Sequence, residues 1–284
     1  MSKAAQASPF NRSVWTRAGW IALAAYIAYA ASRLEITWAR FLVGLDNGAK
    51  FIGRMLPPNI AQPDSLLKGL TESLEIAILA SCLGILISLP IGLLASRNLM
   101  PVWATWPARM CIALCRSFHP VIVAILFVKA VGFGALAGIL ALVVASVGFI
   151  GKLFAEAIEE ISLKQVEAVR ATGAPFMNVI TYGVLPQVFS RFIGFATYQL
   201  DSNLRNSTMV GIVGAGGVGG TLFAAFQRFD YDYVCAILIS IITLIMIGEV
   251  LATGVRAIFI GNATLRDLFR RGGVRPREMH LEDD

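Results

Sequence analysis

Long uncharged runs dominate the pattern of hydrophobic and polar positions along the chain. Residues 76–95 and 130–151 contain 20 and 22 residues without a charge, and 233–248 forms a third such run of 16 residues. A helix needs about 20 apolar residues to cross the hydrocarbon core of a bilayer. The three runs therefore predict membrane-spanning helices.

Three weaker segments, 18–32, 107–129 and 190–212, bring the predicted number of spans to six. Polar residues interrupt two of them: Arg109, Arg116, His119 and Pro120 in the second, and Asp201, Asn203, Arg205 and Asn206 in the third. Ionisable groups are costly in lipid and usually face protein or a water-filled path. We expect the second segment to be broken, and the polar end of the third to face away from lipid.

The composition supports a polytopic membrane protein. Hydrophobic residues make up 57% of the 284 residues and charged residues only 15%, whereas a globular chain is about a quarter charged. The net charge is +6, and arginines gather after the last span, at Arg266, Arg270, Arg271, Arg275 and Arg277. Because Lys and Arg accumulate in cytoplasmic segments of membrane proteins, we expect contact with lipid and none with nucleic acid.

Six spans place both termini on one side, and the basic tails favour the cytoplasm. The expected organisation is a cytoplasmic tail over 1–17, a first span with an external loop over 18–69, a transmembrane domain over 70–260 and a basic cytoplasmic tail over 261–284. An interfacial helix is possible in the external loop, around 51–58. A second interpretation of the first span is a secretory signal, cleaved after Ala28-Tyr29-Ala30.

Glycines cluster in the stretch VGIVGAGGVGG, which begins at Val210. Gly214, Gly216 and Gly219 have the spacing of a dinucleotide-binding fingerprint, and Asp232 follows at a suitable distance. That fingerprint requires a preceding strand and a repeated strand–helix order, which the predicted spans do not provide. The alternative is a tight re-entrant turn at the outer end of a pathway, in which Gly217 joins the three other glycines because glycine permits positive φ.

Metal and nucleotide chemistry have little support in the sequence. The histidines are only His119 and His280, and Cys82, Cys111, Cys115 and Cys235 lie in apolar runs, where we expect buried, inert thiols. No G-x-x-x-x-G-K-[ST] motif is present, so the chain is not itself an ATPase. We expect no metal and no cofactor bound to this chain.

The longest predicted cytoplasmic segment lies between the fourth and fifth spans, over 152–187. Its first half is rich in helix-forming Ala, Glu, Leu and Lys. Gly173 then interrupts the pattern, and Pro175 and Pro186 suit the first turns of further helices. The run Glu167-Ala168-Val169, Gly173 and Leu185-Pro186 resembles the EAA loop of ABC importer permeases, with departures at Val169 for a second Ala and at Gly183 for an Ile.

The resemblance continues over roughly 70–260 and is to the phosphonate/phosphate-type importer permeases. It implies an all-α polytopic membrane protein with the type I ABC importer permease fold, about six transmembrane helices and a cytoplasmic coupling helix, in the bacterial cytoplasmic (inner) membrane. The partners implied are a second permease subunit (an identical chain or a paralogue), two cytoplasmic ATPases that hold ATP and Mg, and an extracytoplasmic solute-binding protein. The substrate implied is a phosphorus oxyanion. The coupling loop would cover 155–187 and contact the ATPase through Glu167, Ala168, Gly173, Ala174, Leu185 and Pro186.

Two intramembrane cations, Arg116 and Arg205, are the candidates for an oxyanion path, because the guanidinium fork suits phosphate-like groups. The candidate donors beside them are His119, Asn203, Ser207 and Thr208. Structural roles are the alternative: Arg116 capping a broken helix, and Arg205 pairing with Asp201 four residues earlier. An ion-coupled secondary transporter also remains open as a function, although it would leave the EAA-like loop unexplained.

Overall fold

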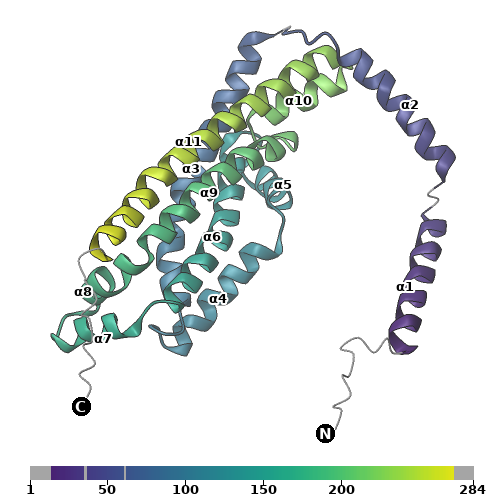
Figure 1. Cartoon of the computed structure of the whole chain (residues 1–284). Coiled ribbons are helices and arrows are strands. Elements are labelled where there is room, and N and C mark those ends of the chain that lie inside the picture. Colours follow the sequence, from purple (N-terminus) through teal and green to yellow (C-terminus); the bar gives the residue numbers. More distant parts are fainter. Residues whose placement is uncertain (1–13, 35–36, 61, 272–284) are drawn as a thin grey trace, which may run out of the picture. The chain divides into compact units, whose positions relative to one another are not determined.

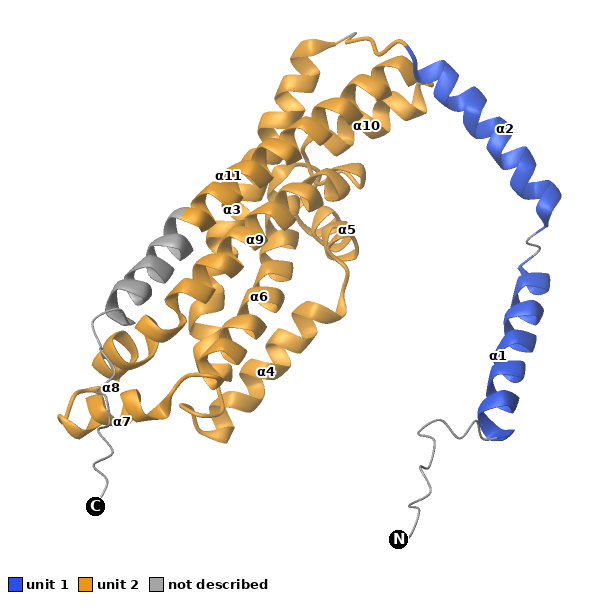
Figure 2. Ribbon diagram, in the orientation of Figure 1, with its two compact units in different colours: residues 1–56 blue, residues 57–284 orange. Residues whose placement is uncertain are grey.

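The computed structural model describes residues 14–34, 37–60 and 62–271, with side chains described as far as Ala257, and it contains no strand within these residues. The chain divides into two compact units, residues 1–56 and 57–284 (Figure 2), and each is described by itself. The organisation expected from the sequence, with a boundary at 69/70, stays a prediction. The predicted basic tails fall largely outside the described residues.

The first unit contains two helices, α1 (Val14–Arg33) and α2 (Trp38–Met55), and neither has a buried residue. Among the described residues, α1 is not one of the helices that are long and apolar enough to cross a membrane. Arg17 and several Trp and Tyr residues lower the hydropathy of α1. The first span, at 18–32, therefore stays a prediction.

Helix α2 is two-sided. It begins after Thr37, whose hydroxyl oxygen accepts a hydrogen bond from the Arg40 backbone N–H at 3.4 Å. Helical spacing places Phe41, Leu45 and Ile52 on one face, and the opposite face carries Arg54 and the Lys50–Asp46 ion pair of 2.6 Å. This arrangement is typical of helices that lie along a membrane surface. The helix expected around 51–58 is present only in part, because α2 starts earlier, at Trp38, and ends at Met55.

The second unit is a helical bundle (Figure 1). Its elements are α3 (Pro63–Ala95), α4 (Val102–Ser117), α5 (Pro120–Val131), α6 (Ala135–Glu159), α7 (Leu163–Ala171), α8 (Phe176–Asn178), the π-helix η1 (Val179–Val184), α9 (Leu185–Ile212), α10 (Val218–Gln227) and α11 (Tyr231–Arg271). α3 packs along α6, and α9 packs against α3, α6 and α11.

Four helical segments among the described residues are long and apolar enough to span a membrane: Pro63–Ala95, Ala135–Glu159, Phe176–Ile212 and Tyr231–Ala257. α4 and α5, bent by 92° from each other, make a fifth if the pair is counted as one broken span; the alternative is a re-entrant loop. The bend lies at His119-Pro120, where proline starts a new helix because it has no N–H to continue the old one. The break predicted within 107–129 is confirmed.

Small residues bring α3 and α6 close together. A Cβ added to Gly84 would lie only 2.4 Å from the Cβ of Ser146, and one added to Gly92 would lie 3.0 Å from the backbone oxygen of Gly151. Membrane helices associate mainly through such close packing and interhelical hydrogen bonds, because lipid offers no hydrophobic driving force between them.

A buried hydrogen-bond network joins α3, α6 and α9. The Asn203 amide Nδ2 donates to Ser81 Oγ and Ser146 Oγ, each at 2.9 Å, and the Gln199 amide donates to Asn203 Oδ1 at 2.9 Å. All four residues are buried. The two serine hydroxyls donate in turn to backbone oxygens of their own helices. Asn203 therefore fixes the register of three helices.

Candidate functional site

A sharp turn at Gly173 separates α7 from α8. The Gly173 φ angle is +75°, and its N–H donates to the Arg170 oxygen at 3.0 Å. A Cβ here would meet nothing within 4 Å, so the backbone conformation and not the available space favours glycine. The predicted break at Gly173 is confirmed.

The inner side of this segment is anchored to the bundle. Val166, Val179 and Val184 are buried and belong to one apolar cluster with Phe154 and Ile158 of α6. Pro186 lies in the first turn of α9. The apolar residues of this segment therefore pack directly on the ends of α6 and α9.

The outer side of the same segment is exposed. Glu167, Ala168, Gly173 and Leu185 are exposed, and Ala174 is half-buried. Three large apolar side chains are exposed on the same stretch: Phe176, Met177 and Tyr182. These three residues lie in α8 and η1, at the start of the Phe176–Ile212 segment, and an exposed apolar surface of this kind suits contact with another protein.

The two departures from the EAA pattern lie against each other. A Cβ on Gly183 would be 3.3 Å from Val166 Cα and 3.7 Å from Val169 Cγ2. The larger Val169 and the smaller Gly183 therefore share one packing site, and the added volume of one is offset by the reduced volume of the other.

The glycine stretch forms a turn between α9 and α10. Gly214, Gly216 and Gly217 have φ of +87°, +83° and +81°, which confirms the tight turn. Gly219 lies in α10, where a Cβ would come within 1.9 Å of the Thr208 oxygen. Helix precedes and follows the turn, so the dinucleotide interpretation is wrong: the strand that it requires is absent from this stretch.

The residues proposed for an oxyanion path do not form one site. Asn203 and Ser207 are buried inside the bundle, and the Ser207 hydroxyl donates to the Leu204 oxygen at 2.7 Å. His119 is the N-cap of α5, where Nδ1 accepts from the Val121 N–H at 3.4 Å. Thr208 is half-buried, and its backbone oxygen is the atom closest to a Cβ added at Gly219. Of the proposed donors, Asn203 and Ser207 have their polar atoms engaged within the bundle.

Arg205 lines a cavity of about 540 Å³ between α9 and α11. α9 contributes Tyr198, Asp201, Ser202 and Arg205, and α11 contributes Glu249, Ala252, Thr253 and Arg256. The two sets have the same helical spacing, so each forms one face. The Arg205–Asp201 ion pair is present at 2.5 Å, while Asp201 Oδ1 is buried and has no hydrogen-bond partner among the described residues.

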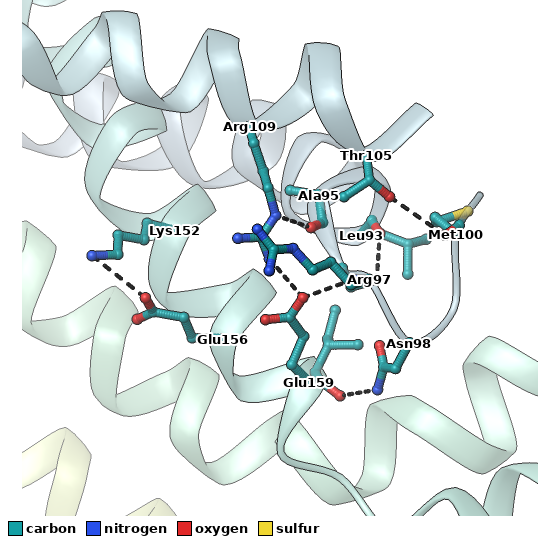
Figure 3. Close-up of polar contacts among 12 residues, drawn as sticks. Leu93, Ala95, Arg97, Asn98, Met100, Thr105, Arg109, Lys152, Glu156 and Glu159 are labelled. Atoms are coloured by element: carbon teal, nitrogen blue, oxygen red, sulfur yellow. Dashed lines mark hydrogen bonds and ion pairs between the residues drawn. The ribbon is translucent and has the colours of Figure 1, made fainter. Parts of the chain in front are cut away.

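Arg116 lines a different pocket, of about 260 Å³, between α4 and α6, and we call it the α4–α6 pocket. It also contains Arg109, Lys152 and Glu156, which the sequence did not single out as a group. Figure 3 shows Arg109 reaching Glu159, with Nη2 2.6 Å from Oε1, and Lys152 pointing toward Glu156. The i, i+7 spacing of Arg109 and Arg116 is the sequence signal that places both on one helix face.

The cysteines differ from expectation. Cys82 and Cys111 are exposed, and Cys115 and Cys235 are partly exposed, so the prediction of buried thiols is wrong. The outer faces of spanning helices are apolar because they meet lipid, so an apolar run does not imply burial in protein. Within the described residues, no three His, Cys, Asp or Glu side chains gather as a metal site.

The fold of the second unit is that of an importer permease. A solved structure described as inward-facing conformations of the MetNI methionine ABC transporter matches with a TM-score of 0.61 and 24% identity, over 68% of this chain and 95% of that chain. A family model described as "Binding-protein-dependent transport system inner membrane component" matches residues 88–259. The chain belongs to this family and is a multi-pass membrane component of a transport system.

Two relatives extend the match. The chain is 36% identical over 245 residues to the phosphite transport system permease protein PtxC of Stutzerimonas stutzeri, covering 84% of this chain and 88% of that protein. It is 37% identical over 238 residues to the phosphate-import permease protein PhnE of Mycolicibacterium smegmatis. In that second comparison 83% of this chain is covered, but it spans only 44% of the relative's length.

Proposed function

We propose that this chain is the translocating subunit of an ATP-driven importer that moves a phosphorus oxyanion, such as phosphate, phosphite or a phosphonate, into the cytoplasm. A second permease subunit, two cytoplasmic ATPases that bind ATP and Mg, and an extracytoplasmic solute-binding protein complete the assembly. The names of the relatives support the substrate class. Both termini would be cytoplasmic, on the same side as the coupling segment.

The observation that carries the proposal is the two-sided arrangement of the coupling segment, the loop predicted at 155–187. Its inner side packs on α6 and α9, and its outer side offers Glu167, Ala168 and exposed apolar groups. When the ATPases close on ATP, a segment held in this way would transmit their movement to the spanning helices. ATP drives transport only if it favours one of the two states, inward-open or outward-open.

The path for the anion would use Arg205 in the α9–α11 cavity, with Thr208 and His119 further along and Arg116 in its own pocket. A guanidinium offers several N–H donors to an oxyanion, but a path must bind weakly enough to release its cargo. The Asp201 carboxylate beside Arg205 would weaken the attraction, which suits passage better than retention.

Co-purification tests the coupling role. This chain, tagged, would be co-expressed with its ATPase and binding protein. We expect Gly173→Asp and Glu167→Lys to abolish recovery of the ATPase while the permease still elutes as a folded species. Glu75→Lys reverses a charge on exposed α3 surface away from the segment and is the matched control. Gly173→Asn, which tolerates positive φ better, should retain more ATPase than Gly173→Asp. Full recovery with both loop variants would show that the segment is not the docking site.

A further inference from the structure

The α4–α6 pocket holds more positive than negative charge. Arg109, Arg116 and Lys152 line it together with a single carboxylate, Glu156. The Arg109 charge is engaged, because Nε donates to the Ala95 oxygen at 2.9 Å and Nη2 pairs with Glu159 at 2.6 Å. Lys152 Nζ is 3.4 Å from Glu156 Oε1. With Glu159 counted, three cations face two carboxylates.

Arg116 is the one of these three cations that is not paired with a carboxylate in the described residues. It makes no ion pair or hydrogen bond within the described residues, and it lies in a helix that forms half of a bent membrane span. Arg116 is exposed in the last turn of α4. A charge in such a segment is costly unless it is paired or reaches water, so Arg116 is available to bind an anion from outside this chain.

The neighbouring helix is shaped to receive Arg116. A Cβ on Gly148 of α6 would lie 2.7 Å from Arg116 Cγ and 3.1 Å from its backbone N, and a Cβ on Gly151 would lie 3.3 Å from Ile112 Cγ1. The glycines let the stem of Arg116 lie on α6. Lys152 follows Gly148 by one helical turn, so the two cations reach the same pocket from different helices.

The pocket lies toward the end of the bundle that carries the coupling segment. Ala95 is the last residue of α3, and Glu159, the partner of Arg109, is the last residue of α6. The apolar part of the wall comes from Ile112, Ala113 and Ala155. Basic pockets between spanning helices on the cytoplasmic side are suited to phosphate-bearing headgroups, whose glycerol and acyl parts contact the apolar wall.

We propose that the α4–α6 pocket binds a phosphate-bearing anion through Arg116 and Lys152. Two sources offer this chemistry: the headgroup of an anionic phospholipid, and a free phosphorus oxyanion reaching the cytoplasmic side. The second source rests on the proposed function, whereas the first requires only that the chain lies in a membrane. Arg116 supplies the forked donors and Lys152 a point charge.

The assembled transporter, purified and placed in lipid nanodiscs, allows both sources to be tested. Native mass spectrometry measures retention of phosphatidylglycerol against phosphatidylcholine, and phosphorus NMR line broadening measures binding of inorganic phosphate. We expect the double variant Arg116→Gln/Lys152→Gln to weaken either phosphatidylglycerol retention or phosphate binding by about tenfold or more, because charge-assisted hydrogen bonds are lost. Lys129→Gln removes a cation from α5, outside the pocket, and should change neither.

The two arms identify the source. Loss of phosphatidylglycerol retention alone assigns a lipid site, and loss of phosphate binding alone assigns a site for the free anion. Gly148→Val is a second variant, for use if the double variant is poorly folded. It displaces Arg116 without changing the charge, and it should cause the same loss of anion binding. The proposal is overturned if the wild-type transporter binds no phosphate and does not prefer phosphatidylglycerol, or if both ligands are held equally by the folded variants. ATPase co-purification is a separate readout, so neither result decides the proposed function.

Discussion

Asn203 stabilises the bundle through a single side chain. Its amide contacts serines of α3 and α6 from its position on α9, and it is fully buried. From the sequence, a polar residue in an apolar span indicates either a path or an interhelical bond. Choosing between them requires knowing that Ser81 and Ser146, 122 and 57 residues away, lie opposite Asn203. Sequence spacing within one helix cannot supply that.

Replacing Asn203 with leucine should lower the free energy of unfolding by about 1–2 kcal/mol, because two serine hydroxyls and the Gln199 amide lose a partner. The measurement is the thermal unfolding midpoint of the purified complex. Asn206→Leu is the control, because its amide makes only a 3.4 Å contact with Ser202 Oγ. An unchanged unfolding midpoint together with abolished transport would show that Asn203 acts in the anion path and does not stabilise the bundle.

At the scale of elements, the turn at Gly173 and the helix start at Pro186 could be predicted from the sequence, and the polar pockets could not. Gly173 and Pro186 punctuate the chain locally, and the structure places a turn and a helix start there. By contrast, the cations of the α4–α6 pocket come from helices whose contact depends on Gly148 and Gly151. Glycines inside an apolar run indicate that another helix packs closely there, but they do not identify that helix.

The contact between Val169 and Gly183 leads to a prediction about the coupling segment. Gly183→Ile restores the family residue but should overpack the site and destabilise the segment by about 1–3 kcal/mol. Adding Val169→Ala should recover part of that loss, because the two residues share one space. The readout is protease resistance of the segment in the purified complex. Strictly additive effects would show that the two positions are independent.

At the scale of the whole molecule, the spanning helices followed from the uncharged runs, and the break in 107–129 followed from its polar residues and Pro120. The permease fold was expected only from the resemblance of the EAA-like loop and its surroundings to importer permeases. The helices of the first unit were harder to predict from the sequence. A helix was expected only around 51–58, whereas α2 covers Trp38–Met55, and glycines at 44, 48 and 53 interrupt its two-sided pattern. Aromatic residues and Arg17 keep α1 below the hydropathy of the clear spans, so composition alone does not make it a sixth.

The central claim is that transport depends on ATP hydrolysed by a separate subunit. The most direct test is uptake of radiolabelled phosphate and phosphite into vesicles that contain this chain with its ATPase and binding protein. We predict accumulation only when ATP is present on the ATPase side and the binding protein is present on the other. Uptake by this chain alone, driven by an ion gradient and unaffected by ATP, would contradict the account and identify a secondary transporter.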